Sequence, residues 1–355
     1  MKRKFNVFKF IIFLICVILF FGLILAMTFI FMLRPTGNKN ETVKLNVETG
    51  STYYSLIDEL KEEDLIKSEL VFKIYLKFRS PKNLDAGVYN LNKGMSVSEL
   101  IDALEERNTN NPDAVVVTIP EGKRIEEIAE IMSKTINKTK EELLLTWNNS
   151  EFIDEVISKY WFITEDVKKE GIRYSLEGYF FPSTYELQNK EVSEKDVAYT
   201  LLDQMEKELE EYKEVLENSN YTVHELLTMA SIVEYEAILD EDRPIIAGVF
   251  YNRLNDGMKL QSCATVGYAI GEWKLSYDET DLLVDSVYNT YYYSGFPIGP
   301  ANAPSKKSIE AAIYPEDTIY YYFLADVCSE NPKTYFSETL SEHNRKASEY
   351  LTCLW

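Results

Sequence analysis

The most pronounced pattern in the chain is an uninterrupted apolar stretch near its start. Residues 10–33, FIIFLICVILFFGLILAMTFIFML, carry no charged side chain. A helix of that length extends about 36 Å, which is enough to span a bilayer core of about 30 Å. The stretch is longer than the apolar core of a signal peptide, and no small-x-small cleavage site follows it. The pattern therefore predicts an uncleaved membrane-spanning helix within residues 1–34.

A shorter pattern recurs from Val43 onward and consists of an alternating apolar strand, a glycine and an apolar pair spaced i, i+4. The copies contain Gly50, Leu56 and Leu60; Gly94, Leu100 and Leu104; and Gly122, Ile128 and Met132. Each copy predicts a strand, a tight turn and a helix with one buried face. Such units resemble carbohydrate-binding LysM-type modules, although a purely structural packing unit has the same pattern.

The composition changes along the chain predict its domain organisation. Residues 35–41, PTGNKNE, are polar and predict a linker that reaches at most about 25 Å. Residues 42–107 predict a LysM-like module, and residues 114–172 predict a second strand–helix module followed by a helical connector. From residue 173 to 352 the sequence becomes aromatic and rich in turns. We therefore expect an α+β protein with a single N-terminal transmembrane helix, LysM-like modules and a final mixed α+β domain.

Apolar periodicity also predicts individual elements of the final domain. Helices are expected at 194–217, 223–238, 305–313 and 341–351, and a strand is expected at 319–325. The intervening residues 239–304 are rich in Gly, Pro and Tyr and are expected to form mainly loops.

The charge distribution restricts the partners and suggests an orientation. The net charge is −21, so a phosphate backbone would be repelled and nucleic acid is not expected as a ligand. Four basic residues precede the apolar stretch and one follows it. By the positive-inside rule, the N-terminus is expected in the cytoplasm and residues 35–355 outside the cell membrane.

Cysteine and histidine are too sparse to indicate a metal centre. Outside the apolar stretch there are Cys263, Cys328 and Cys353, without CxxC spacing, so one disulfide and three free thiols are both consistent with the sequence. The chain has two histidines and no phosphate-binding, dinucleotide-binding, GxSxG or HExxH motif. We therefore expect neither a metal nor a cofactor.

Carboxylates are the remaining candidates for catalysis. Glu234 lies on an apolar helical stripe within HELLTMASIVEYEAI, where desolvation favours the protonated form required of a general acid. Glu236 also has apolar neighbours, so periodicity does not choose between the two. A buried ion pair of Glu234 with Arg243 or Arg253 is an alternative interpretation.

Several strings together resemble the MltG/YceG-like family of endolytic murein transglycosylases. They are VTIPEGKRIEEIAEIM, LEGYFFPSTYEL, LTMASIVEYEA, GVFYNRLNDGMKLQS, YNTYYYSGFPIGPANAPS, YYFLAD and SEHNRKASEYL, in the same order and behind a single anchor. The resemblance places the family's catalytic Glu on Glu234. It implies cleavage of the β-1,4 bond between N-acetylmuramic acid and N-acetylglucosamine, which leaves 1,6-anhydro ends, without a metal.

The aromatic loop 288–304 supplies three of the four candidate substrate-binding residues, and Gln261 is the fourth. Tyr rings cover sugar faces, and amides bind hydroxyl or acetamido groups. The predicted binding residues are Gln261, Asn289, Tyr291 and Asn302.

The chain departs from the family pattern at two places. Cys263 and Ala264 stand where Asp-Pro is usual, and Ser305 stands where Gly is common. Two hypotheses remain. The first, implied by the resemblance, is an active membrane-anchored enzyme that terminates or trims nascent peptidoglycan strands. The second is a catalytically weak wall-binding scaffold that docks peptidoglycan synthases.

Overall fold

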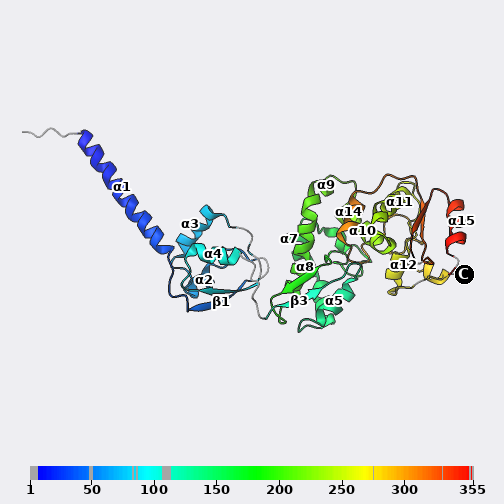
Figure 1. Ribbon diagram of the computed structural model, residues 1–355, viewed down its shortest axis with the longest axis horizontal. Helices are drawn as coiled ribbons and strands as arrows, with labels where there is room; N and C mark the ends of the chain where they lie inside the picture. The colour runs from blue at the N-terminus through cyan, green and yellow to red at the C-terminus, as the bar shows by residue number, and fades with distance from the viewer. Residues whose placement is uncertain are drawn as a thin grey trace, which may run out of the picture. The chain divides into compact units, whose positions relative to one another are not determined.

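The computed structural model describes residues 7–47, 51–81, 84, 87–105, 113–274, 276–329, 331–351 and 353 (Figure 1). Two compact units are present, Met1–Ala114 and Val115–Trp355. Both combine helices with antiparallel strand pairs, which confirms the expected mixed α+β class. Gly50 of the first repeat and residues 1–6 lie outside the described residues.

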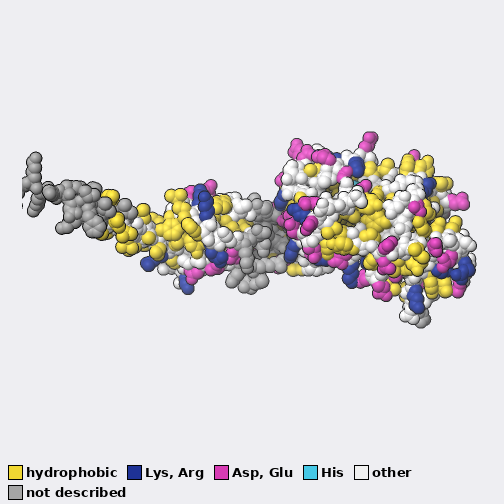
Figure 2. All heavy atoms as spheres, turned by 90° about the horizontal axis from the view of Figure 1, so that it is seen from above, with side chains coloured by type: hydrophobic (Ala, Val, Ile, Leu, Met, Phe, Trp, Pro, Cys, Tyr) yellow, Lys and Arg dark blue, Asp and Glu magenta, His cyan; other side chains and the backbone are white. Residues whose placement is uncertain are grey.

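The N-terminal helix α1 (Val7–Met32) coincides with the apolar stretch. Its segment Phe13–Met32 is long and apolar enough to cross a membrane, a property that a signal sequence shares. Large apolar side chains such as Phe20 and Leu25 are exposed on it, and Figure 2 shows hydrophobic side chains along the described part of this helix. An apolar environment would be required to cover them.

The first unit packs helices on a two-stranded antiparallel sheet. Its elements after α1 are β1 (Thr42–Val47), α2 (Ile57–Glu62), α3 (Glu69–Arg79), β2 (Gly87–Asn92) and α4 (Val97–Glu105). Val43 of β1 pairs with Leu91 of β2. The strands therefore come from the first two sequence repeats, and their alternate side chains share one core with the helices. The third helix, α3, was not predicted.

The predicted linker 35–41 is held against the first unit. The amide groups of Thr36 and Gly37 donate to the carbonyl oxygen of Lys93 at 3.1 and 2.8 Å. Val97 in turn donates to the carbonyl oxygen of Leu33 at 3.0 Å. These bonds shorten the free tether between α1 and β1.

The second unit begins with the third repeat. Its first elements are β3 (Val115–Thr118), α5 (Ile125–Ser133), α6 (Lys140–Trp147), α7 (Ser150–Lys159), the 3-10 turn Glu165–Lys168 and β4 (Thr184–Leu187). Strand β3 pairs antiparallel with β4, so residues 115–172 share a hydrophobic core with the segment that follows residue 173. The expected helix 194–217 is divided into α8 (Glu194–Leu209), a 3-10 turn (Glu210–Tyr212) and α9 (Lys213–Glu217).

The remaining elements carry the candidate site. They are α10 (Val223–Glu236), the 3-10 turn Asp240–Asp242, α11 (Arg243–Asn255), α12 (Cys263–Ile270), α13 (Glu279–Leu282), α14 (Lys306–Ile313), β5 (Tyr322–Ala325), β6 (Thr334–Ser337) and α15 (Leu340–Tyr350). Helices α10, α11 and α14 lie side by side (Figure 1). Contrary to the loop expectation for residues 239–304, α11, α12 and α13 lie there. Cys328 and Cys353 form a disulfide, which resolves the open thiol question.

Candidate active site

Glu234 lies in the last turn of α10. Helix α10 starts at a capping box made by Thr222 and Glu225 and ends at Glu236, with Ala237 as its C-cap residue, and most of its residues are buried. The side chain of Glu234 is 8% exposed. A nearly buried carboxylate requires polar partners to offset its desolvation, so its hydrogen bonds identify the site.

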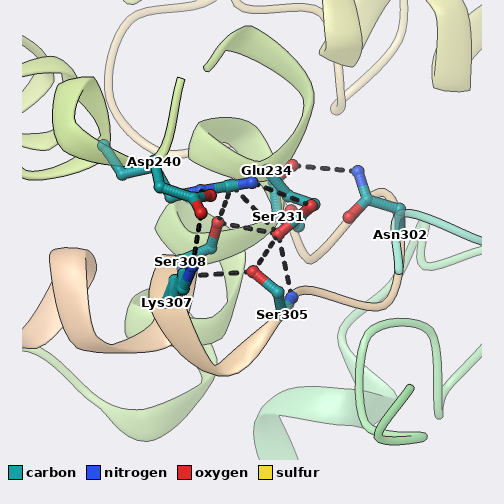
Figure 3. Close-up of polar contacts among 8 residues, drawn as sticks. Ser231, Glu234, Asp240, Asn302, Ser305, Lys307 and Ser308 are labelled. Atoms are coloured by element: carbon teal, nitrogen blue, oxygen red, sulfur yellow. Dashed lines mark hydrogen bonds and ion pairs between the residues drawn. The ribbon is translucent and has the colours of Figure 1, made fainter. Parts of the chain in front are cut away.

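One oxygen of Glu234 accepts most of these bonds (Figure 3). Oε2 accepts the backbone N–H of Ser305 at 2.9 Å, the Ser305 hydroxyl at 2.5 Å and the Ser308 hydroxyl at 2.7 Å. Ser305 is the N-cap residue of α14, so Oε2 also faces the positive end of that helix dipole. These contacts hold the carboxyl group in one orientation.

Arg243, the first residue of α11, supplies the positive charge at the site. Its Nη1 lies 3.2 Å from Glu234 Oε2, and its Nη2 lies 3.5 Å from Oε1. Its Nε donates to Asp240 at 3.1 Å, and Asp240 also pairs with Lys307. The ion pair expected with Arg243 is therefore present, whereas Arg253 donates to the carbonyl oxygens of Tyr321 and Leu260.

The two carboxylate oxygens of Glu234 consequently differ. Oε2 has four donor groups, whereas among the described residues Oε1 accepts only the long contact from Arg243. Oε1 is therefore the oxygen left for exchange of a proton with a ligand.

The loop between β3 and α5 brings a second carboxylate toward Glu234. Gly122 donates to the carbonyl oxygen of Ala303 at 2.8 Å, and Ala303 donates to that of Lys123 at 2.8 Å. Gly122 has a φ of +71°, and a Cβ built on it would lie 3.8 Å from Glu234 Cγ. Burial, and then the negative charge of Glu234, raise the pKa of Glu121. Our sequence reasoning did not select Glu121, although it lies within the IPEG string of the third repeat.

Glu236 has different surroundings. The Ser262 hydroxyl donates to its Oε1 at 2.6 Å at the N-terminus of α12, and burial raises the pKa of Glu236. This carboxyl group thus binds the start of α12, while Glu234 binds α11 and α14. The structure separates two residues that periodicity could not.

Two of the predicted binding amides are buried and hydrogen-bonded to backbone. Asn302 donates to the carbonyl oxygen of Ser231 at 2.9 Å and lies beside the Glu234 cluster (Figure 3). Asn289 donates to the carbonyl oxygens of Leu282 and Val284 at 3.0 and 2.8 Å. Both amides therefore fix loops near the site, and their contact with substrate stays a prediction.

The other two predicted binding residues, Gln261 and Tyr291, lie near the N-terminus of α12. Gln261 is exposed, with a φ of +54°. Tyr291 is half-buried, and its hydroxyl lies 3.6 Å from Cys263 Sγ. Burial, and then the charge of Glu236, raise the pKa of the Cys263 thiol. Roles of Gln261 and Tyr291 in substrate binding stay predictions.

Comparisons with known proteins identify relatives along nearly the whole chain. The sequence model of the YceG-like family matches residues 45–349. A Bacillus subtilis (strain 168) protein named endolytic murein transglycosylase is 35% identical over 323 residues, which cover 90% of this chain and 88% of the relative. A protein of the same name from Streptococcus pneumoniae serotype 2 (strain D39) is 34% identical, and the match covers 90% of this chain and 60% of that relative.

A solved structure agrees with these matches. The crystal structure of a YceG-like protein from Listeria monocytogenes superposes with a TM-score of 0.63 at 36% identity. The superposition covers 86% of this chain and 99% of that chain. The agreement in sequence and fold identifies this chain as a member of the YceG-like family.

Proposed function

We propose that this chain is an endolytic lytic transglycosylase that cleaves the β-1,4 bond between N-acetylmuramic acid and N-acetylglucosamine in peptidoglycan. The names of the similar relatives support the activity and the murein substrate. The observation that carries the assignment of Glu234 is the difference between its two oxygens: Oε2 is held by donors, and Oε1 is left for the substrate.

In the proposed reaction, Glu234 Oε1 gives its proton to the glycosidic oxygen as the bond to the muramyl anomeric carbon breaks. The 6-hydroxyl of the same muramyl residue then attacks that carbon and returns its proton to Oε1, which closes a 1,6-anhydro ring. A tethered hydroxyl has a high effective concentration, so no second carboxylate is required to activate water. Arg243, Ser305 and Ser308 keep the carboxyl group in place through Oε2.

The test is digestion of purified peptidoglycan by the full-length protein in detergent, followed by mass spectrometry. Products with 1,6-anhydro ends are expected, without ¹⁸O from labelled water. Glu234→Gln keeps the size of the side chain but removes the transferable proton, so cleavage should fall at least ~10²-fold. Glu236→Gln is the matched control and should cost far less. Near-normal cleavage by Glu234→Gln, or the reverse ranking, would refute the assignment.

We also propose that α1 anchors the protein in the cell membrane, with the N-terminus cytoplasmic and residues 35–355 outside. The basic residues before the span and the Cys328–Cys353 disulfide support this orientation, since disulfides persist in oxidising compartments. Protease added to wall-stripped cells should digest residues 35–355 and spare a tag before Lys2. The opposite pattern would contradict the orientation.

We also propose that residues 42–107 bind glycan, as LysM-type modules do.

The scaffold alternative, with peptidoglycan synthases as partners, derives from Cys263. It predicts tight glycan binding without cleavage of any strand. In that event, Cys263→Asp with Ala264→Pro should restore cleavage. An active wild-type protein would eliminate this alternative.

A further inference from the structure

Tyr235, the residue that follows Glu234, presents an exposed aromatic ring at the end of α10. It follows Glu234 in the last turn of α10, and the helix ends one residue later. Tyr235 is 39% exposed, which is unusual in a helix whose preceding residues are almost all buried. The end of the helix therefore leaves an aromatic side chain uncovered next to the proposed acid.

Trp273 covers one face of this ring. The two ring centroids lie 4.4 Å apart with an interplanar angle of 19°, which is a stacked pair. Trp273 itself packs on Gly267 of α12, where an added Cβ would lie 2.5 Å from Trp273 Cε3. Only glycine at this position leaves room for the indole, so close packing against α12 fixes the position of the ring behind Tyr235.

Arg124 holds Trp273 from the N-cap position of α5. Its guanidinium carbon lies 4.5 Å from the centroid of the Trp273 ring, and the residue is 7% exposed. Among the described residues, its buried Nε has no hydrogen-bond partner. A desolvated guanidinium interacts favourably with an aromatic face. Arg124 thus packs against the Trp273 ring that backs Tyr235.

We propose that Tyr235, backed by Trp273, is the surface on which one N-acetylhexosamine ring of the glycan strand stacks beside Glu234. The inference rests on the proposed function and names the part of the site that binds the sugar. A pyranose ring has an apolar C–H face that matches an aromatic ring, and its hydroxyls stay hydrated at the rim. The loop before α5 reaches both places: a Cβ built on Gly122 would lie 3.8 Å from Glu234 Cγ, and Arg124 contacts the Trp273 ring. A sugar stacked on Tyr235 would therefore lie within the same glycan-binding region as Glu234.

Kinetics of the full-length protein on soluble glycan strands, released from peptidoglycan by an amidase, test this proposal. Stacking is present equally in the ground state and the transition state, so Tyr235→Leu should raise KM ~10-fold with little change in kcat. Tyr235→Phe keeps the ring and should retain the wild-type KM. Tyr314→Ala is the matched control, because Tyr314 is 55% exposed and its ring also contacts another, that of Tyr212.

A second measurement reports binding without cleavage. In the Glu234→Gln background, the same strands should change tryptophan fluorescence, and Trp273→Phe should remove most of that change while retaining affinity. An unchanged KM for Tyr235→Leu, or equal damage by Tyr235→Phe, would overturn the proposal. A wild-type protein that cuts no strand would instead refute the proposed function, and fluorescence would still decide whether glycan contacts Trp273.

Discussion

Glu177 is expected to make the stability of the second unit depend on pH. It is 2% exposed and accepts the backbone N–H of Ile125 at 2.9 Å and the Tyr268 hydroxyl at 3.0 Å. It therefore connects the start of α5 with α12. Burial raises the pKa of Glu177 from 4.5 to about 8.

The sign of the effect follows from proton linkage. Between pH 4.5 and about 8 the unfolded chain has released this proton, while the folded protein keeps it. The contribution to the free energy of unfolding is complete below pH 4.5 and is lost as the pH rises through about 8. At 1.36 kcal/mol per pKa unit, the shift corresponds to at most about 5 kcal/mol.

Glu177→Gln isolates this contribution, because the amide oxygen can accept the Ile125 N–H and the NH2 group can donate to the Tyr268 oxygen, as the O–H of the protonated acid does. Urea unfolding should show equal stability of variant and wild type near pH 4.5 and a more stable variant near pH 8.5. All four tryptophans lie after residue 146, so their fluorescence reports on the second unit. Parallel pH curves, or a less stable variant at pH 8.5, would refute the reasoning.

Two further substitutions test packing and cross-linking. Gly178→Ala would place a Cβ 2.3 Å from Pro300 Cβ at a φ of +79°. Urea unfolding should therefore show that the free energy of unfolding falls by more than ~2 kcal/mol. Gly257→Ala is the control: its φ is also positive but its Cβ would lie in open space, so it should cost only ~1 kcal/mol. Cys353→Ser removes the bridge to Cys328 across 25 residues and should lower stability by about 3.5 kcal/mol. Addition of a reductant should lower the stability of the wild type by the same amount and leave the stability of Cys353→Ser unchanged.

The sequence was sufficient for the helix that carries Glu234. The apolar run alone predicted a helix over residues 223–238, within two residues of the observed end of α10. Helix α11 was missed because Pro244 and Gly248 resembled loop residues. Pro244 lies in the first helical turn, where its missing N–H is tolerated, and a Cβ on Gly248 would lie 2.2 Å from the carbonyl oxygen of Glu316. Such a tertiary constraint on a glycine is not visible in a single sequence.

Periodicity alone did not distinguish Glu234 from Glu236, although the family resemblance had placed the catalytic Glu on Glu234. The two residues share one helical turn, so their local sequence is nearly the same. Their partners are distant in the chain: Ser305 binds Glu234, and Ser262 binds Glu236. At the 3-10 turn that divides the predicted helix 194–217, the Tyr212 hydroxyl donates to Glu310 of α14 at 2.6 Å. Contacts between residues so far apart in the chain are not visible in a single sequence.

The two departures from the family pattern affect different carboxylates. Cys263 begins α12, and its thiol faces the region of Glu236, so a neutral group stands where an Asp would place a second negative charge. Ser305 contributes a hydroxyl to Glu234 Oε2 at 2.5 Å, a donor that a glycine could not supply. The direct contact with the proposed acid is therefore gained at Ser305, while Cys263 alters its neighbour. Since the backbone N–H of Ser305 also reaches Oε2, a glycine at this position would keep that one bond from the N-terminus of α14.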